Sequence, residues 1–355
     1  MTVWDNIRGH SERVEWLRRA IQRNRLSHGY VFAGKEGIGK RLFARAVAQC
    51  LFCQRHADEE LLACGECSAC KQVLAGTHPD LHEVGRPAGK AELPIAAFLG
   101  PPENRGREGL CYDLSRLPMA GDRKIAIIDD ASAMNDEAAN AFLKTLEEPP
   151  PKALIMLIVD NLDALLPTIR SRCQVIRFDP LLPADLADLM LQLEWVKEPA
   201  EAAALSELSD GSLAVAAQLL DPALRELRDA LYRELASPNF NSIELTEQLT
   251  SGLEAIGGDT ATTRRNAVWL IRFGLEFFRS AAMHLSGQQS GGVIPAAVSF
   301  AQRFDGQSPE DLEFIMSLFE RVAETERHID MNIAVPRCLE VLCHELGQKL
   351  RPAAR

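Results

Sequence analysis

Residues 34–40, with the sequence GKEGIGK, have the types and spacing that could bind a phosphate group. A G-x-x-x-x-G-K loop between a strand and a helix surrounds phosphate with backbone N–H groups, and its lysine neutralises the charge. The next residue is normally Ser or Thr, whose hydroxyl binds magnesium, but here it is Arg41. We therefore predict a degenerate nucleotide site at Gly34, Gly39 and Lys40, in which hydrolysis is severely impaired. A glycine-rich turn that binds nothing is the alternative, so nucleotide binding stays open.

Asp129 and Asp130 follow the apolar run KIAII and could add a metal ligand to the same site. In nucleotide hydrolases a carboxylate at a strand end helps to hold magnesium, and a nearby acid can orient the attacking water. Asp129 has the position of the first, whereas Asp130 is one methylene shorter than the Glu that usually does the second. Two acids that only solvate a strand end would look the same. We predict that Asp129 belongs to the degenerate nucleotide site.

The strongest metal-binding pattern is a C-x10-C-x2-C-x2-C run formed by Cys53, Cys64, Cys67 and Cys70. Closely spaced thiolates can surround zinc tetrahedrally, and four protein ligands leave no open position for catalysis. The sequence therefore predicts a structural zinc ion in a module of about residues 50–72. Cys50, one helical turn before the run, and His56, inside the segment, are alternative ligands.

The elements that must position these residues have the pattern of a buried parallel sheet. Four apolar runs lack period-two alternation, as strands covered on both faces do, and helical patterns lie between them. These runs are residues 29–34, 124–130, 153–160 and 174–180. A helix is predicted after Asn135, which has the residue type of an N-cap, and should stop at Pro149. The fold class is therefore a doubly wound α/β domain.

Two further domains are predicted beyond the sheet. Pro180 and Pro183 indicate a boundary, so we assign residues 1–179 to the α/β domain with its zinc module. Residues 180–222 have the pattern of a small helical domain, and residues 223–355 that of an all-helical domain. Between the zinc module and the second predicted strand, the segment rich in Pro and Gly is expected to be a mobile surface loop; it covers residues 86–114.

The composition excludes several classes of function. At 355 residues the chain is long enough for two or three domains, and its net charge of −11 argues against a free-standing nucleic-acid binder. No apolar stretch is long enough to span a bilayer, and charges interrupt the region where a signal peptide would be apolar. We expect a cytoplasmic protein with no membrane partner, whose cysteines are reduced.

The order of the motifs resembles the clamp-loader branch of the AAA+ ATPases, in particular its delta-prime subunits in bacterial DNA polymerase III. The motifs are the phosphate loop, the four cysteines, GTHPDLHEV, IIDDA, NAFLKTLEEPP and SRC, and NIAVPRCLEVLCHEL at residues 332–346 resembles the last helix of that family. The resemblance implies a RecA-like AAA+ domain with an inserted zinc module, a small helical lid domain and an all-α collar domain that holds five subunits in a ring.

The resemblance also implies a role for Arg172. In this family the arginine of SRC reaches a neighbouring subunit's ATP as an arginine finger, which stabilises the charge of the transferring phosphoryl group. Hydrolysing relatives carry a lid arginine where this chain has Ala214, and Arg41 replaces the magnesium-binding hydroxyl. The implied function is therefore that of a subunit with no ATPase activity of its own, which scaffolds the loader and donates Arg172.

Partners follow from the same resemblance. They are the other loader subunits, gamma/tau and delta, through the collar and the AAA+ faces, and the sliding clamp and primed DNA in the assembled complex. The subunit would be part of the DNA-directed DNA polymerase holoenzyme, a nucleotidyltransferase. Two alternatives are an active ATPase resembling gamma/tau, which would tolerate Arg41, and a nucleic-acid-binding zinc protein, which the acidic composition disfavours.

Overall fold

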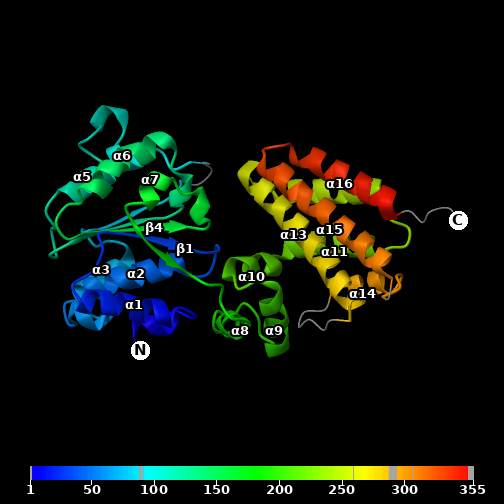
Figure 1. The fold of residues 1–355 in the computed structure, drawn as a ribbon, viewed down its shortest axis with the longest axis horizontal. Helices are drawn as coiled ribbons and strands as arrows, with labels where there is room; N and C mark the ends of the chain where they lie inside the picture. Colours follow the sequence, from blue (N-terminus) through cyan, green and yellow to red (C-terminus); the bar gives the residue numbers. More distant parts are fainter. Residues whose placement is uncertain are drawn as a thin grey trace. The chain divides into compact units, whose positions relative to one another are not determined.

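A parallel sheet organises the first half of the chain (Figure 1). The computed structural model describes residues 2–87, 90, 92–258, 260–287, 294–306 and 308–350. Within these residues the sheet has five strands in the order β2-β3-β4-β1-β5, and every neighbouring pair is parallel. The strands are β1 (Gly29–Ala33), β2 (Leu81–Val84), β3 (Lys124–Ile128), β4 (Ala153–Val159) and β5 (Gln174–Arg177). The predicted doubly wound α/β class is confirmed.

Burial explains why the sequence predicts the three central strands, whereas β5 was predicted although it is partly exposed. Every residue of β1, β3 and β4 is buried, which is why these strands lack alternation. β5 is an edge strand with two exposed residues, and β2, at the other edge, is half-buried throughout. β2 was not predicted, because its four residues LHEV include two polar side chains.

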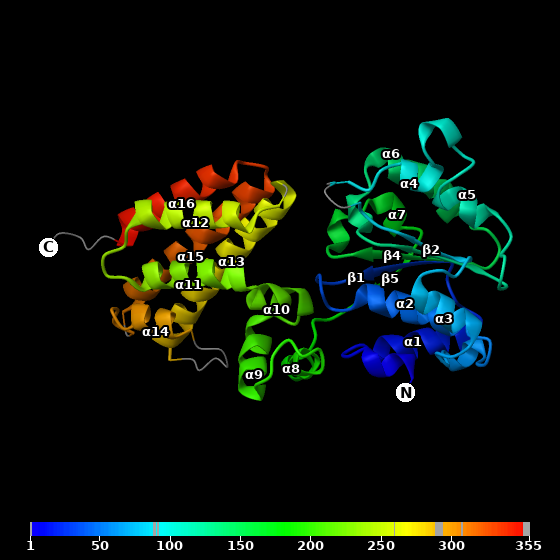
Figure 2. The ribbon, with the colours of Figure 1, turned by 180° about the vertical axis from the view of Figure 1, so that it is seen from behind.

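Helices cover both faces of the sheet (Figures 1 and 2). One face carries α1 (Ser11–Gln22), α2 (Lys40–Leu51) and α3 (Ser68–Ala75), and the other carries α4 (Ala96–Leu99), α5 (Leu110–Ser115), α6 (Asp136–Glu147) and α7 (Pro167–Arg170). Short 3₁₀ turns are Val3–Asn6, Asp58–Glu60, Pro102–Asn104, Ala131–Ala133 and Leu162–Ala164. Alternate strand residues face opposite cores, so that Tyr30 and Phe32 lie in one core and Val31 and Ala33 in the other.

The predicted helix after Asn135 is present as α6. The Asn135 side chain accepts a hydrogen bond from the Ala138 N–H at 2.9 Å, which satisfies a donor in the first turn. Its buried residues are Ala138, Ala139, Phe142 and Leu146. The helix ends at Glu147, two residues before Pro149, and this end places Glu147 beside α7, as described below.

The prediction of a surface loop at residues 86–114 is wrong where the segment forms helices. It contains α4 and α5, and Phe98, Leu110 and Leu114 are buried in the core on the α6 side of the sheet. The Phe98 ring lies 5.2 Å from the ring of Phe142. Helices of four and six residues are too short to show a period in the sequence, which explains the error. Residues 88, 89 and 91 lie outside the described part.

The GTHPDLHEV motif is explained by a buried carboxylate. Asp80 is fully buried and accepts backbone N–H bonds from Met119, Ala120 and Gly121 at 2.7, 2.7 and 3.0 Å. Burial alone would raise the pKa of Asp80, but these three donors outweigh it and hold the pKa below its ordinary value. The motif therefore joins the start of β2 to the turn before β3.

Two units are distinguished by the density of their internal contacts: Met1–Leu189 with Asp210–Ala214, and Met190–Ser209 with Val215–Arg355. The described helices beyond β5 are α8 (Pro183–Gln192), α9 (Pro199–Leu208), α10 (Leu213–Leu220), α11 (Pro222–Ala236), α12 (Ser242–Ile256), α13 (Thr260–Leu285), α14 (Pro295–Ala301), α15 (Pro309–Asp330) and α16 (Val335–Leu350). Helical structure after residue 180 is as predicted, and the domain boundaries at residues 179 and 222 stay predictions. No helix in the described ranges is long and apolar enough to cross a membrane.

Candidate functional site

The phosphate-type loop connects β1 to α2, and its lysine is already bound by its own chain. Lys40 is the first residue of α2 and is only 4% exposed. Its ammonium group donates to the carbonyl oxygens of Gly34 and Lys35 at 2.5 and 2.6 Å and to the carboxylate of Asp160 at 2.8 Å. An ammonium group has three N–H donors. All three thus have acceptors within the protein, where a nucleotide phosphate would otherwise compete for them.

Residues 210–214 lie directly on this loop. The Leu213 N–H donates to the Gly37 carbonyl at 3.0 Å, and the Ser212 hydroxyl donates to the Glu36 carbonyl at 2.7 Å. A side chain at Gly37 would place its Cβ 2.5 Å from the Cβ of Ala214. The loop is therefore held by the segment that contains Ala214.

Substitution of Gly37 tests how closely residues 210–214 pack against the phosphate-type loop. Gly37 and Gly39 both have positive φ, +75° and +94°, but a Cβ at Gly39 would meet nothing within 4 Å. Gly37→Ala and Gly39→Ala should each lose about 1–3 kcal/mol for the strained backbone. Gly37→Ala should lose roughly another 1–3 kcal/mol, because Ala214 must move. Urea unfolding of the two variants measures the difference, and equal losses would show that the segment does not press on the loop.

Arg41 pairs with the carboxylates that a magnesium site would use. Its guanidinium lies 3.1 Å from a carboxylate oxygen of Glu83 and 3.4 Å from one of Asp129, and Arg45 contacts Glu83 at 2.9 Å. Burial raises the pKa of Asp129, and the charge of Arg41 partly offsets this effect. A guanidinium has no lone pair for a metal ion. Where a hydroxyl would bind magnesium, this chain therefore places a fixed positive charge.

The predicted residues Gly34, Gly39, Lys40 and Asp129 meet at the carboxyl edge of the sheet. Two further acidic residues contact this group of residues and were not predicted to belong to it. Asp160, at the end of β4, was left without a role, and Glu83 lies on β2, the strand that the sequence did not reveal. Asp130 is turned toward Arg86, whose Nε lies 3.1 Å from its carboxylate.

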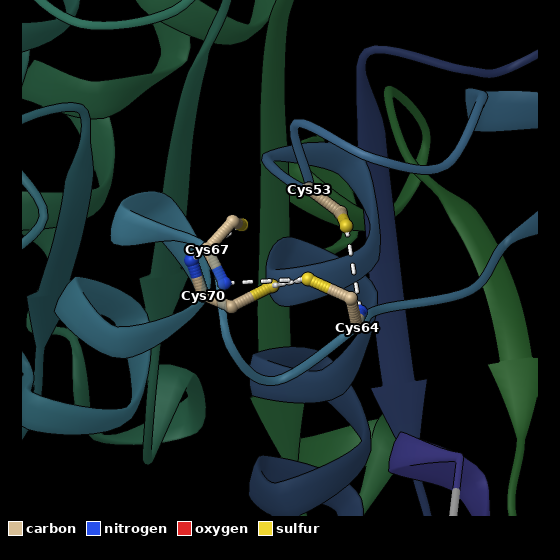
Figure 3. Close-up of side chains that lie close together, drawn as sticks. All are labelled: Cys53, Cys64, Cys67 and Cys70. Atoms are coloured by element: carbon tan, nitrogen blue, oxygen red, sulfur yellow. Dashed lines mark hydrogen bonds between the residues drawn. The ribbon is translucent and has the colours of Figure 1, made fainter.

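The four predicted cysteines come together at the end of α2 and the start of α3 (Figure 3). Their Sγ atoms all lie within 4.8 Å of one another, and those of Cys64 and Cys70 are 4.0 Å apart. Zn–S bonds of about 2.3 Å in a tetrahedron separate the sulfurs by roughly 3.8 Å. Gly65, with φ +71°, allows the tight turn between Cys64 and Cys67. The donor set thus fits a metal ion such as zinc.

Backbone N–H groups support thiolates in this cluster. The N–H groups of Cys64, Cys67 and Cys70 lie 3.3–3.4 Å from the sulfurs of Cys53, Cys64 and Cys67, respectively. Donation from the backbone at Cys67 and Glu66 lowers the pKa of Cys64 to about 6, which favours the metal-binding form.

The two alternative ligands do not belong to the cluster. Burial in α2 raises the pKa of the Cys50 thiol, which keeps it protonated and unreactive. The His56 ring nitrogen Nδ1 instead lies 2.7 Å from the carboxylate of Glu60.

Arg172 lies at the amino ends of the strands, whereas the phosphate-type loop lies at their carboxyl ends. It follows α7 and directly precedes Cys173 and β5, whose strand runs parallel to β1. A Cβ at Gly29, the first residue of β1, would lie 3.6 Å from the Arg172 carbonyl. The loop begins after Ala33, the last residue of β1, and five strand residues span about 13 Å.

The guanidinium of Arg172 is one-third exposed and bound by its own chain. Its Nη2 donates to the Glu147 carboxylate at 2.5 Å, and its Nη1 donates to the Thr168 carbonyl at 2.8 Å and the Ser171 hydroxyl at 3.2 Å. Neighbouring Arg170 has a longer contact, 3.4 Å, with the exposed carboxylate of Asp163.

These features define a class of protein: an AAA+-like α/β domain with a degenerate phosphate loop and a four-cysteine module, followed by helical regions. Residues 9–182 match the family model described as "DNA polymerase III, delta subunit". Over these residues the chain is similar to the clamp-loader family, in its delta-prime branch, as the resemblance implied.

The matches to individual relatives span only a little more than half of each relative's length. The chain is 42% identical over 208 residues to DNA polymerase III subunit delta' of Pseudomonas aeruginosa, which is 57% of this chain and 58% of the relative. It is 34% identical over 193 residues to the same subunit of Bacillus subtilis, covering 53% and 54%. A gamma subunit-related protein of Thermotoga maritima of known structure is 20% identical with a TM-score of 0.42, covering 95% of this chain and 99% of that one.

Proposed function

We propose that this chain is a non-hydrolysing, delta-prime-type subunit of a DNA polymerase III clamp loader and donates Arg172 to the ATP site of a neighbouring subunit. In this proposal it is a fixed part of a pentameric loader that places the sliding clamp on primed DNA. Gamma/tau and delta are its partners, reached through the AAA+ faces and the helices after residue 223.

The observation that carries the proposal is the separation of Arg172 from its own phosphate-type loop. The two lie at opposite ends of β1, about 13 Å apart along the strand by the rise of a β-strand. An arginine side chain cannot cross that distance through a buried sheet. A partly exposed guanidinium at this end of the strands can therefore serve a phosphoryl group only if another subunit brings it there.

The state of the loop supports the absence of hydrolysis. Lys40 is bound by three oxygens of its own chain, and the carboxylate of Asp129 is paired with Arg41. Ala214 offers no charge to a γ-phosphate. Without a hydroxyl ligand for magnesium and without a cationic side chain at position 214, the site lacks groups that stabilise a transferring phosphoryl group.

The four cysteines would hold a structural zinc ion in the same proposal. Four thiolates favour zinc and leave no position for substrate or water. The ligands are Cys53, Cys64, Cys67 and Cys70, and Leu61 of their segment and Val73 of α3 are buried in the same core cluster as residues of α2. The zinc module would therefore stabilise the face of the domain that carries α1 and α2.

The isolated chain should neither hydrolyse ATP nor bind it tightly. The measurement is steady-state ATP turnover together with titration of a fluorescent ATP analogue, each with and without magnesium. A hydrolysing gamma/tau-type subunit, assayed in parallel, is the positive control. We expect no turnover, and weak or absent binding that magnesium does not improve, because Arg41 repels the cation.

An active ATPase resembling gamma/tau is the second candidate. It is favoured by one observation, the survival of Lys40 and Asp129 together at the carboxyl edge of the sheet. Tight, magnesium-dependent binding with turnover by the isolated chain would establish this candidate and overturn the first.

A further inference from the structure

Glu147 and Arg172 belong to the two motifs LEEPP and SRC, and the fold brings them into contact. Glu147 is the last residue of α6, and its carboxylate accepts a hydrogen bond from Arg172 Nη2 at 2.5 Å. The residues are 25 positions apart in the chain. The contact joins the end of one helix on the sheet to the segment that enters the edge strand β5.

A carboxylate at this place is unfavourable for α6 alone. The C-terminus of a helix carries partial negative charge, so that an acidic residue in the last turn is disfavoured unless a cation compensates it. Lys144 lies in that turn, but the contact of Glu147 is with Arg172. An acidic residue at a position that is unfavourable for the helix points to a role for that residue outside the helix.

The contacts of Arg172 fix the plane of its guanidinium and leave some of its N–H donors without an acceptor in the described part of the chain. A guanidinium has five N–H groups. Three are used by Glu147, Thr168 and Ser171, all from its own chain. The Nε–H and one Nη2–H have no acceptor among the described residues, and the side chain is 34% exposed. Arg170, in contrast, makes a single contact at 3.4 Å and is 45% exposed.

We infer that Glu147 is a positioning residue for the arginine finger. It holds the guanidinium so that its two remaining N–H groups project from the edge of the sheet toward anionic oxygens of a docked partner. The inference rests on the proposed function of Arg172, and the ligand class is the phosphoryl oxygens of a neighbour's bound nucleotide. An orientation fixed before docking removes a search that a free side chain would have to make in every turnover.

The opposite role for the same contact is storage, in which Glu147 competes with the phosphate and must release Arg172. The two roles predict opposite changes in the rate of ATP hydrolysis when Glu147 is removed. Removal of a positioning residue slows hydrolysis at the neighbouring site, whereas removal of a storage contact speeds it.

The test uses the reconstituted loader and ATP hydrolysis stimulated by primed DNA and clamp, measured in the steady state, which gives kcat and KM, and in single turnovers. For Glu147→Ala we expect kcat to fall about ten-fold with little change in KM, since a small misorientation of a reacting group has effects of this order. Glu147→Gln keeps an acceptor oxygen and should return to within about two-fold of the parent. Glu148→Ala is the matched control, because Glu148 is the next residue, is exposed and makes no contact with Arg172.

Combination with Arg172→Ala separates the inference from the proposed function. The double variant Glu147→Ala, Arg172→Ala should be no slower than Arg172→Ala alone, because Glu147 acts through Arg172. An Arg172→Ala loader with unchanged hydrolysis would sink the proposed function itself. A slow Arg172→Ala loader beside a Glu147→Ala loader of parental or higher rate would overturn only the positioning role.

Folding is checked by thermal unfolding of each variant chain and by assembly on gel filtration. Glu147 is about half exposed, so Ala should be tolerated. If the Glu147→Ala chain nevertheless unfolds, a folded Glu147→Lys chain provides a second test. Its ammonium group repels the guanidinium, so positioning predicts a loss of kcat at least as large, and a parental rate in this variant contradicts the inference.

Discussion

Replacing Arg172 with Ala should leave the chain folded and assembled while stopping ATP hydrolysis at the site that it serves. An arginine finger is worth about 10³–10⁵ in kcat, because it stabilises the charge of the transferring phosphoryl group. Its loss should cost the chain little stability, since partly exposed ion pairs such as that with Glu147 contribute only about 0.2–1 kcal/mol. The effect is thus expected in the loader's chemistry and nowhere in the isolated protein.

Single-turnover hydrolysis by the reconstituted loader measures this effect, because it resolves the lost site from those that still work. Arg172→Lys should fail nearly as badly, since an ammonium group lacks the planar fork of the guanidinium. Arg170→Ala is the matched control: Arg170 lies on the same segment, is more exposed and makes one long contact. Unchanged single-turnover amplitudes in Arg172→Ala would exclude the finger assignment, and loss of assembly would show that Arg172 is instead an interface residue.

The sequence predicted the central strands and missed an edge strand for the same physical reason. β1, β3 and β4 are buried on both faces, so their residues are apolar without interruption. β2 is half-buried and has only four residues, and its polar His82 and Glu83 gave no strand signal. Its position became clear only from its pairing with β3, which is a property of the whole sheet.

The candidate sites divide in the same way between local and distant contacts. The four cysteines lie within 18 residues of sequence, so their spacing alone predicted the cluster. Lys40 and Asp160 are 120 residues apart, and no local pattern relates them. The occupied state of the loop lysine, like the contact between Glu147 and Arg172, therefore required the fold.

Replacing Cys70 with Ser should remove the metal and unfold the segment that it holds. Cys70 is fully buried, and a serine hydroxyl is a poor substitute for a thiolate in a zinc site. Structural zinc binding is worth about 10–16 kcal/mol in small zinc-binding peptides, where the metal and folding are coupled. Here residues 53–70 also contribute Leu61 and Ala63 to the core beside α2, so that their release exposes apolar surface. We expect a chain without zinc and with a strongly lowered unfolding temperature.

Metal content by mass spectrometry, calorimetry with and without a chelator, and limited proteolysis together test this expectation. The parent chain should hold about one zinc ion, as a four-thiolate site requires, and the chelated parent should melt like Cys70→Ser. New proteolytic cleavage should fall between residues 53 and 70 and not in the strands. Cys111→Ser is the control, because Cys111 is a half-buried thiol of the same unit that lies outside the cluster. A Cys70→Ser chain that keeps its zinc, or a parent chain whose melting ignores the chelator, would show that these thiols are not a structural metal site. Because each assay reads the isolated chain, the result is independent of whether Arg172 acts on a neighbour.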